Sequence, residues 1–257
     1  MRFSEVLAVS CCMLLLSCSV KEDRDVCPCR LVIDMSQVDT SVVKYAELVV
    51  SASGNFITRD TLSAADFKDE YVALVPREEV GVGVYFGAED CVDDSGGLGI
   101  AYGDECPQVY MHSSLVLAQG EMMKETVSMR KNHCIMTIQV QTEKEFPFRL
   151  EARGNVDGYE LGGMPSEGRF MYSMGADHGG VCRLILPRQT DESLILEVHD
   201  GTDVLKTFAL GEYVAASGYD WQEEDLRDIT VSLDYSMTRV GISVAGWRDE
   251  YTFDVVI

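Results

Sequence analysis

The sequence predicts an all-β protein built from two antiparallel β-sandwiches in tandem. From about residue 30 onward, apolar residues recur mostly at every second position, which is the period of a half-buried strand. Turn-forming residues separate nearly all of these short runs, and no long amphipathic helix interrupts them. A single sheet of so many strands would exceed the usual size, so we expect two sandwiches of about seven strands each.

The two series of strands meet near Met129 to His133, where "VSMR" ends one series and "CIMTIQV" begins the next. We therefore expect an N-terminal sandwich over residues 30–131 and a C-terminal sandwich over residues 132–257. This junction has no Pro- or Ser-rich linker, so the domains should stack with limited freedom. The clearest strand is "DITVSLDY", where four alternating residues should face the core: Ile229, Val231, Leu233 and Tyr235. The only late segment that suggests a helix is "YDWQEEDLRD".

The N-terminus is typical of an export signal, in which the apolar core Val6 to Leu16 is too short to span a bilayer. "LLSC", Leu15 to Cys18, matches the bacterial lipobox. The lipobox predicts cleavage of a signal peptide over residues 1–17, a diacylglycerol thioether on Cys18 and acylation of the new amine. Such acyl chains hold a protein firmly at a membrane. The alternative is an ordinary cleaved signal with an incidental cysteine.

Residues 18–29 are expected to form a lipidated N-terminus and a charged spacer. The stretch "SVKEDRD" directly after Cys18 resembles the lysine-plus-acidic signal that sends Bacteroidales lipoproteins to the outer face of the outer membrane. A plain solvated linker is the alternative interpretation.

Charge excludes some classes of partner. The chain has 21 basic and 43 acidic residues, which gives a formal net charge of -22. A surface of this sign repels nucleic acid and anionic lipid headgroups. We therefore expect neither nucleic-acid binding nor peripheral lipid binding.

The cysteines after Cys18 lie in an exported chain, where disulfides are permitted. Cys91 and Cys106 flank a loop rich in Gly and Asp, and a bridge between them would stabilise the fold by about 3 kcal/mol in the entropy model. "CPC" at Cys27 to Cys29 suggests half a metal site, but no second Cys or His pair follows at zinc spacing. The pairing of these two cysteines stays open.

Two further cysteines, Cys134 and Cys182, lie in or beside apolar strands, so we expect buried thiols there rather than ligands.

Residues that carry catalytic chemistry are sparse. Neither a Gly-x-Ser-x-Gly motif nor a dinucleotide-binding loop is present, and only four histidines occur: His112, His133, His178 and His199. An acidic loop offers oxygen ligands without the spacing of a calcium loop: Glu89, Asp90, Asp93 and Asp94. Trp221 and Trp247 are too far apart in sequence to form a sugar platform. We expect no catalytic residue, cofactor, metal or small-molecule substrate.

The mature chain resembles the FimB-type fimbrial anchor proteins of Bacteroidales, the minor-fimbrium anchors included. Four stretches carry the resemblance in order along the chain: "LLLSCSVKEDRDVCPCRLVID", "VSMRKNHCIMTIQV", "WQEEDLRDITVSLDY" and "VGISVAGW". Cys18, Cys27 and Pro28 follow the order of the family, in which a lipidated Cys precedes a charged spacer and a Cys-Pro pair. Cys29 is an extra residue relative to that pattern.

The resemblance implies two transthyretin-like sandwich domains and a non-catalytic role in attaching a fimbrium to the outer membrane, with influence on fibre length. It also implies fimbrial stalk subunits as partners, joined by β-strand addition, in which a partner strand completes an open sheet. The final stretch "TFDVVI" would then pair either within its own sheet or with a partner. The alternative function is a surface lipoprotein that binds a glycan or a host protein.

Overall fold

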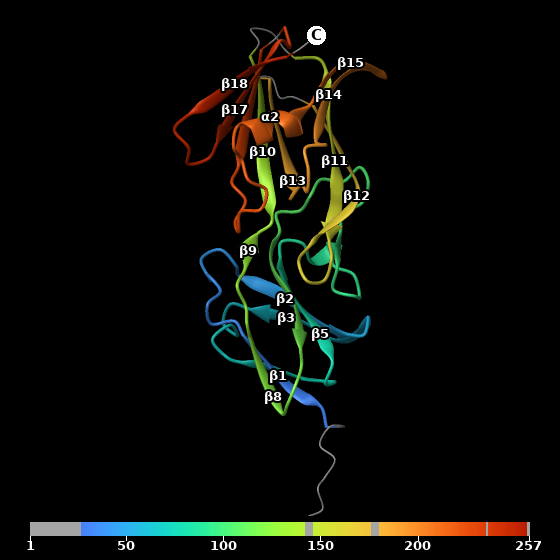
Figure 1. Ribbon diagram of the computed structural model, residues 1–257, viewed down its shortest axis with the longest axis vertical. Helices are drawn as coiled ribbons and strands as arrows, with labels where there is room; N and C mark the ends of the chain where they lie inside the picture. Colours follow the sequence, from blue (N-terminus) through green and yellow to red (C-terminus); the bar gives the residue numbers. More distant parts are fainter. Residues whose placement is uncertain (1–26, 142–145, 176–179, 235, 256–257) are drawn as a thin grey trace, which may run out of the picture.

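The computed structural model describes residues 27–141, 146–175, 180–234 and 236–255, and nearly all of its regular structure is β. Two sandwiches are stacked end to end along the long axis, with the N-terminal one at the bottom of Figure 1 and the C-terminal one at the top. This architecture confirms the predicted all-β fold. Cys18, His178 and Tyr235 lie outside the described residues.

The N-terminal sandwich has one three-stranded and one five-stranded sheet, ordered β4-β1-β8 and β3-β2-β5-β7-β9. Its strands are β1 (Cys29–Asp34), β2 (Tyr45–Ala52), β3 (Asn55–Ser63), β4 (Tyr71–Val75), β5 (Glu79–Phe86), β7 (Tyr110–Leu117), β8 (Met122–Thr126) and β9 (Arg130–Lys131). A short 3-10 helix, η2 (Glu89–Cys91), follows β5, and the short strand β6 (Leu98–Gly99) leaves this sandwich to pair with β11 of the other.

The C-terminal sandwich packs the sheet β13-β10-β16-β17-β18 against the sheet β12-β11-β14-β15. Its strands are β10 (His133–Gln141), β11 (Arg149–Tyr159), β12 (Pro165–Gly175), β13 (Val181–Pro187), β14 (Ile195–Asp200), β15 (Asp203–Phe208), β16 (Ile229–Asp234), β17 (Arg239–Val244) and β18 (Glu250–Asp254). The helix α2 (Leu210–Ala216) connects β15 to β16. Each sandwich therefore has slightly more strands than the seven predicted.

The two sandwiches repeat one topology. The first strand of each lies between an antiparallel and a parallel neighbour: β1 lies between β4 and β8, and β10 lies between β13 and β16. The facing sheets also correspond, as β3-β2-β5-β7 and β12-β11-β14-β15. The main difference is that β17 and β18 extend the C-terminal sheet beyond β16, whereas β8 is the last strand of its sheet among the described residues.

Two strand pairs differ from the antiparallel arrangement that we predicted. β8 runs parallel to β1, and β16 runs parallel to β10. The strands before them, β7 and β15, lie in the opposite sheet. The chain therefore crosses the sandwich before it enters the first sheet, and a crossing of this kind lets the new strand run in the same direction as its neighbour.

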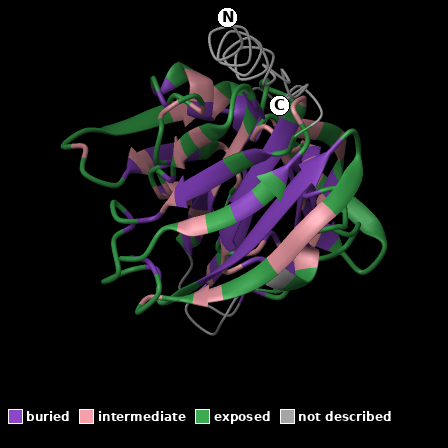
Figure 2. Cartoon of the chain, turned by 90° about the horizontal axis from the view of Figure 1, so that it is seen from below, coloured by how far each residue is buried: buried purple, intermediate pink, exposed green. Residues whose placement is uncertain are grey.

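Alternation places the core side chains where the sequence predicts them. In β16, Ile229, Val231 and Leu233 are buried, while the residues between them are partly exposed. Seen along the long axis, the buried stretches of the strands lie in the interior and the exposed loops surround them (Figure 2). The last described strand, β18, pairs antiparallel with β17 of the same chain.

The apolar core of the C-terminal sandwich extends into the N-terminal half of the sequence. One buried cluster joins the C-terminal strands to residues between 88 and 111, and to Val49 and Tyr85 on the neighbouring sheet. A second cluster fills the N-terminal sandwich alone. Although β9 ends at Lys131 and β10 begins at His133, the domain limits 30–131 and 132–257 stay a prediction, because this shared cluster crosses them.

A contact between Leu161 and Gly81 packs the two sandwiches against each other. Leu161 lies in the loop between β11 and β12, and this loop packs against the outer face of β5. There the Leu161 side chain occupies the place that a Cβ on Gly81 would take. Gly81 is therefore required for close packing rather than for an unusual backbone conformation.

Gly81→Val should displace Leu161 from the junction and lower the free energy of unfolding by about 1–3 kcal/mol, the usual cost of overpacking. Denaturant unfolding followed by circular dichroism measures the change. Gly99→Ala is the matched control, because a Cβ at Gly99 meets no atom within 4 Å. Equal stability of the two variants would contradict this account of the junction.

Candidate functional site

The predicted lipidation site, Cys18, lies outside the described residues, so the structure leaves it a prediction. None of the described helices has the length and apolarity that a membrane-spanning helix needs. The two thiols of "CPC" lie in different environments: Cys27 is exposed, whereas Cys29 begins β1 and is buried in the N-terminal core. They do not form a shared pair of ligands pointing to one site.

Cys91 and Cys106 lie close enough for the first thiol to affect the second. Burial raises the pKa of the Cys106 thiol well above its usual value, and the nearby Cys91 raises it further. No disulfide is present among the described cysteines, so the bridge stays a prediction.

The acidic loop that was considered as a calcium site folds around Asp93. One carboxylate oxygen of Asp93 accepts hydrogen bonds from the Ser95 N–H at 2.8 Å, the Ser95 hydroxyl at 2.6 Å and the Gly97 N–H at 3.0 Å. Burial disfavours the charged carboxylate, but these hydrogen bonds outweigh it and hold its pKa below the usual value. Asp94 points into solvent. The loop uses Asp93 to shape a turn.

The described histidines are held by neighbouring groups. His112 accepts a hydrogen bond from the Ser128 N–H at Nδ1, and its Nε2 lies 3.0 Å from the Glu125 carboxylate. The Ser114 hydroxyl donates to the same carboxylate oxygen at 2.8 Å. This polar group spans the side of the N-terminal sandwich between β7 and β8. His133 is buried at the junction, with its Nδ1 3.0 Å from the Val109 carbonyl oxygen.

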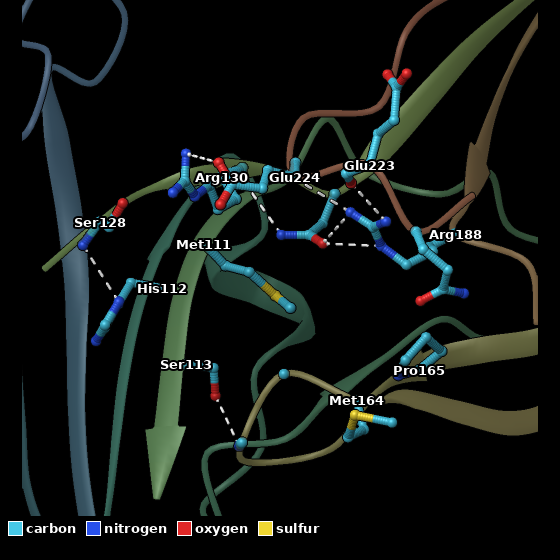
Figure 3. Close-up of a pocket in the computed structure, with 14 residues that line it drawn as sticks. Met111, His112, Ser113, Ser128, Arg130, Met164, Pro165, Arg188, Glu223 and Glu224 are labelled. Atoms are coloured by element: carbon cyan, nitrogen blue, oxygen red, sulfur yellow. Dashed lines mark hydrogen bonds and ion pairs between the residues drawn. The ribbon is translucent and has the colours of Figure 1, made fainter. Parts of the chain in front are cut away.

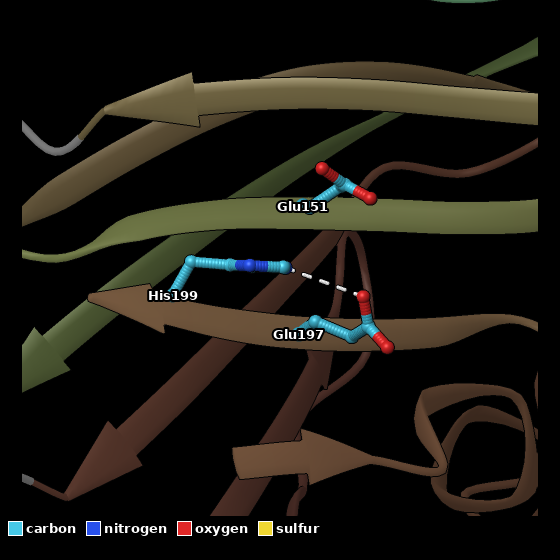
Figure 4. Close-up of side chains that lie close together, drawn as sticks. All are labelled: Glu151, Glu197 and His199. Atoms are coloured by element: carbon cyan, nitrogen blue, oxygen red, sulfur yellow. Dashed lines mark hydrogen bonds and ion pairs between the residues drawn. The ribbon is translucent and has the colours of Figure 1, made fainter. Parts of the chain in front are cut away.

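A charged cluster on the outer face of the C-terminal sandwich was not predicted as a site. Ligand atoms of Glu151, Glu197 and His199 lie within 4.8 Å of one another, on the neighbouring strands β11 and β14 (Figure 4). In the sequence, the only sign of this cluster is that Glu197 and His199 alternate along one strand and therefore point to the same face. Glu151 stands directly opposite Glu197 across the strand pair, so their charges need compensation.

Two arginines supply that compensation. Arg149 and Arg153 bind the two oxygens of Glu151 at 3.1 and 2.6 Å. Arg153 also lies 3.3 Å from Glu197, whose same oxygen lies 3.2 Å from His199 Nε2. Because guanidinium groups already occupy the carboxylate oxygens, we interpret the cluster as a charge network rather than a metal site.

The most extensive polar network lies at the junction and centres on Arg188. Arg188 follows β13 and is only 8 % exposed. Its guanidinium donates to the Asn132 side-chain oxygen at 3.1 and 3.3 Å, and to the backbone carbonyls of Trp221, Glu223 and Glu224. Asn132 lies between β9 and β10, so one side chain binds the interdomain linker to the segment before β16.

Other groups hold the same linker. The hydroxyl of Tyr159, whose pKa is raised by burial, donates to the Asn132 carbonyl and accepts from the Arg188 N–H at 2.8 Å. Lys131 donates through its N–H to Asp225 at 2.7 Å, and its ammonium binds Asp228 at 2.5 Å. Sequence patterns could not identify this network, because its partners are far apart in the chain and several are backbone carbonyls.

A cleft of about 380 Å³ opens beside this network, between the two sandwiches. Figure 3 shows Arg130 and Arg188 on one wall, Met164 and Pro165 on the opposite side, and Met111 between them. Arg130 binds Glu224 at 2.8 Å, and Arg188 is saturated by the contacts above. The polar groups of the cleft therefore serve the junction, and the cleft is best described as a recess in it.

The fold, but not the sequence, matches known proteins. No protein-family model matches the chain, and no curated protein sequence matches it. The fimbrial anchor protein Mfa2 from Porphyromonas gingivalis has a similar structure, with a TM-score of 0.56, 11 % sequence identity and coverage of 86 % of this chain and 98 % of that one.

Two Bacteroides proteins show the same likeness. One, from Bacteroides thetaiotaomicron, is described as a candidate polysaccharide-binding protein (TM-score 0.60, 14 % identity, 89 % of this chain and 98 % of that one). The other, from Bacteroides ovatus, is described as a candidate adhesin (TM-score 0.56, 13 % identity, 87 % and 95 %). At these identities the likeness establishes that the chain has their two-sandwich fold.

Arg188→Ala should lower the free energy of unfolding by about 2–3 kcal/mol, because it leaves the Asn132 side chain and several carbonyls without their charged donor. Thermal unfolding measured by calorimetry tests this. Arg248→Ala is the control, since Arg248 is exposed and far from the junction along the chain. A loss no larger than that of the control would show that the Arg188 network does not stabilise the fold.

Under oxidising conditions Cys91 and Cys106 should form a disulfide that stabilises the protein by about 3 kcal/mol. Peptide mass spectrometry without reduction should find the two cysteines linked, and a reductant should lower the unfolding temperature. In the Cys91→Ser control, the reductant should have no such effect. Alkylation of both thiols in protein isolated from the cell exterior would refute the bridge.

Proposed function

We propose that the chain is a non-catalytic, lipid-anchored subunit that attaches a fimbrium to the bacterial outer membrane. The observation that carries this proposal is the match in fold to a fimbrial anchor over almost the whole of both chains. The lipobox at Leu15 to Cys18 supports it independently, because an anchor at the base of a fibre needs a membrane attachment. A role in limiting fibre length belongs to the same proposal.

The junction suits such a role. A subunit between a membrane and a fibre transmits tension, and a flexible linker would absorb it by reorientation. Here the linker residue Asn132 is bound by Arg188 and Tyr159, and Leu161 packs against the neighbouring sheet. The two sandwiches are therefore held as one elongated body.

We further propose that a fimbrial stalk subunit joins the chain by strand addition. An edge strand offers unpaired backbone groups to a partner strand, and charged residues on an edge oppose such pairing. β15 pairs on one side only among the described residues, and its Val204 and Leu205 are both exposed. The edge strand β18 of the facing sheet carries Glu250 and Asp254, and β15 itself carries Asp203 and Lys206, so charge does not distinguish the two edges. β15 is the better-suited edge because its two apolar side chains are more exposed than Tyr251 of β18.

Glycan binding is the alternative, because one structural neighbour is described as a candidate polysaccharide-binding protein. The aromatic pair Trp247 and Tyr251, whose ring centroids lie 6.2 Å apart, is one candidate for a sugar platform. Their rings are inclined by 72°, so they do not form one flat surface on which a sugar ring could stack. This pair therefore gives glycan binding no support.

Cys18→Ala should release the protein, together with attached fibres, into the culture medium, because the substitution removes the thiol that carries the lipid. Immunoblotting of membrane and medium fractions and electron microscopy of the medium measure the release. Cys27→Ala is the matched control, since Cys27 is a neighbouring exposed cysteine outside the lipobox. Retention of the Cys18→Ala protein on the membrane would disprove the anchor.

A further inference from the structure

The outer face of the three-stranded sheet β4-β1-β8 carries apolar side chains where solvent-facing residues are expected. The registers align Leu74, Arg30 and Met122 in one row across the three strands. Leu74 is 62 % exposed and Met122 is 64 % exposed. The next row consists of Val72, Val32 and Lys124, of which Val72 is 42 % exposed.

The polarity of this face changes with distance from the start of β1. The first row is apolar apart from Arg30, which has no ion-pair partner among the described residues. In the second row Lys124 reaches toward the acidic side, where it binds Asp34 at 2.9 Å and Glu70 at 3.1 Å. The face therefore passes from apolar and cationic near the N-terminal end of β1 to acidic farther along the strand.

The proposed lipid attachment lies close to the apolar end. β1 begins at Cys29, at the lower end of the molecule in Figure 1. A fully extended chain from Cys18 to Cys29 spans at most about 40 Å. The sheet is thus confined near the bilayer, and at the high effective concentration that a short tether produces, even a weak contact is populated.

We propose that this outer face, defined by Val72, Leu74, Arg30 and Met122, rests on the surface of the lipid bilayer. This inference depends on the proposed function, because the lipid on Cys18 supplies the tether. The apolar side chains enter the interfacial region, where Arg30 pairs with lipid phosphate, and Lys124 extends its stem along the apolar surface. The carboxylates of Asp34 and Glu70 stay in water, which reconciles the contact with a net charge of -22.

Tryptophan quenching tests the contact directly. The full-length lipidated protein is reconstituted in phosphatidylcholine vesicles with and without brominated acyl chains, which quench a nearby indole. Leu74→Trp places the probe on the face, and Met122→Trp repeats the test on β8. Met164→Trp is the matched control, because Met164 is similarly exposed, at 67 %, but lies at the junction. Trp221 and Trp247 in the C-terminal sandwich provide a constant background.

The indole introduced at position 74 or 122 should lose emission in brominated vesicles and shift to shorter wavelength, and the indole at position 164 should do neither. Flotation of the same vesicles shows independently whether the protein is anchored. Protein that floats with unquenched indoles at both positions would overturn the contact and leave the anchor intact. This is the result expected if a protein partner, rather than lipid, covers the face. Protein that does not float would overturn both proposals.

Discussion

The structure depends on one buried guanidinium at the junction. A buried charge is costly unless its donors are satisfied, and Arg188 meets that condition with an amide oxygen and three backbone carbonyls. The same bonds fix Asn132, whose N–H donates to the Val109 carbonyl at 3.1 Å, so the buried charge also holds the linker against the N-terminal sandwich. Interdomain motion would also break the ion pairs that Arg130 and Lys131 of β9 form with Glu224 and Asp228, and this favours movement of the two sandwiches as one body.

The two sandwiches share a topology but cover the same side of their cores differently. In the C-terminal sandwich, α2 and β17 cover the side of the core between the two sheets. In the N-terminal sandwich, the polar group of His112, Ser114 and Glu125 spans the corresponding side. Inward-pointing polar residues at a sheet edge discourage pairing with another chain. Polar side chains therefore protect this side of the N-terminal sandwich, whereas β15, at the far end of the molecule, pairs on one side only among the described residues (Figure 1).

Sequence patterns predict the strands well because alternation is a local property. It placed Ile229, Val231 and Leu233 in the core. The helix α2 was missed, since it has only seven residues and no side-chain cap, while the segment "YDWQEEDLRD", predicted as a helix, is irregular. The parallel pairs, Arg188 and the Glu151 cluster depend on contacts between distant segments, which no local pattern encodes.

The parallel pairing also determines how the proposed anchor would bear load. Tension from the lipid reaches the N-terminal end of β1, and tension from the fibre reaches the C-terminal end of β8 through β9 and β10. Because β1 and β8 run parallel, these forces would slide the strands past each other and load together all the hydrogen bonds of the stretch in which Arg30 to Asp34 lie beside Met122 to Thr126. An antiparallel pair loaded at one end would open one bond at a time. β1 is also paired with β4 on its other side, so the strand that carries the tether is held along both edges.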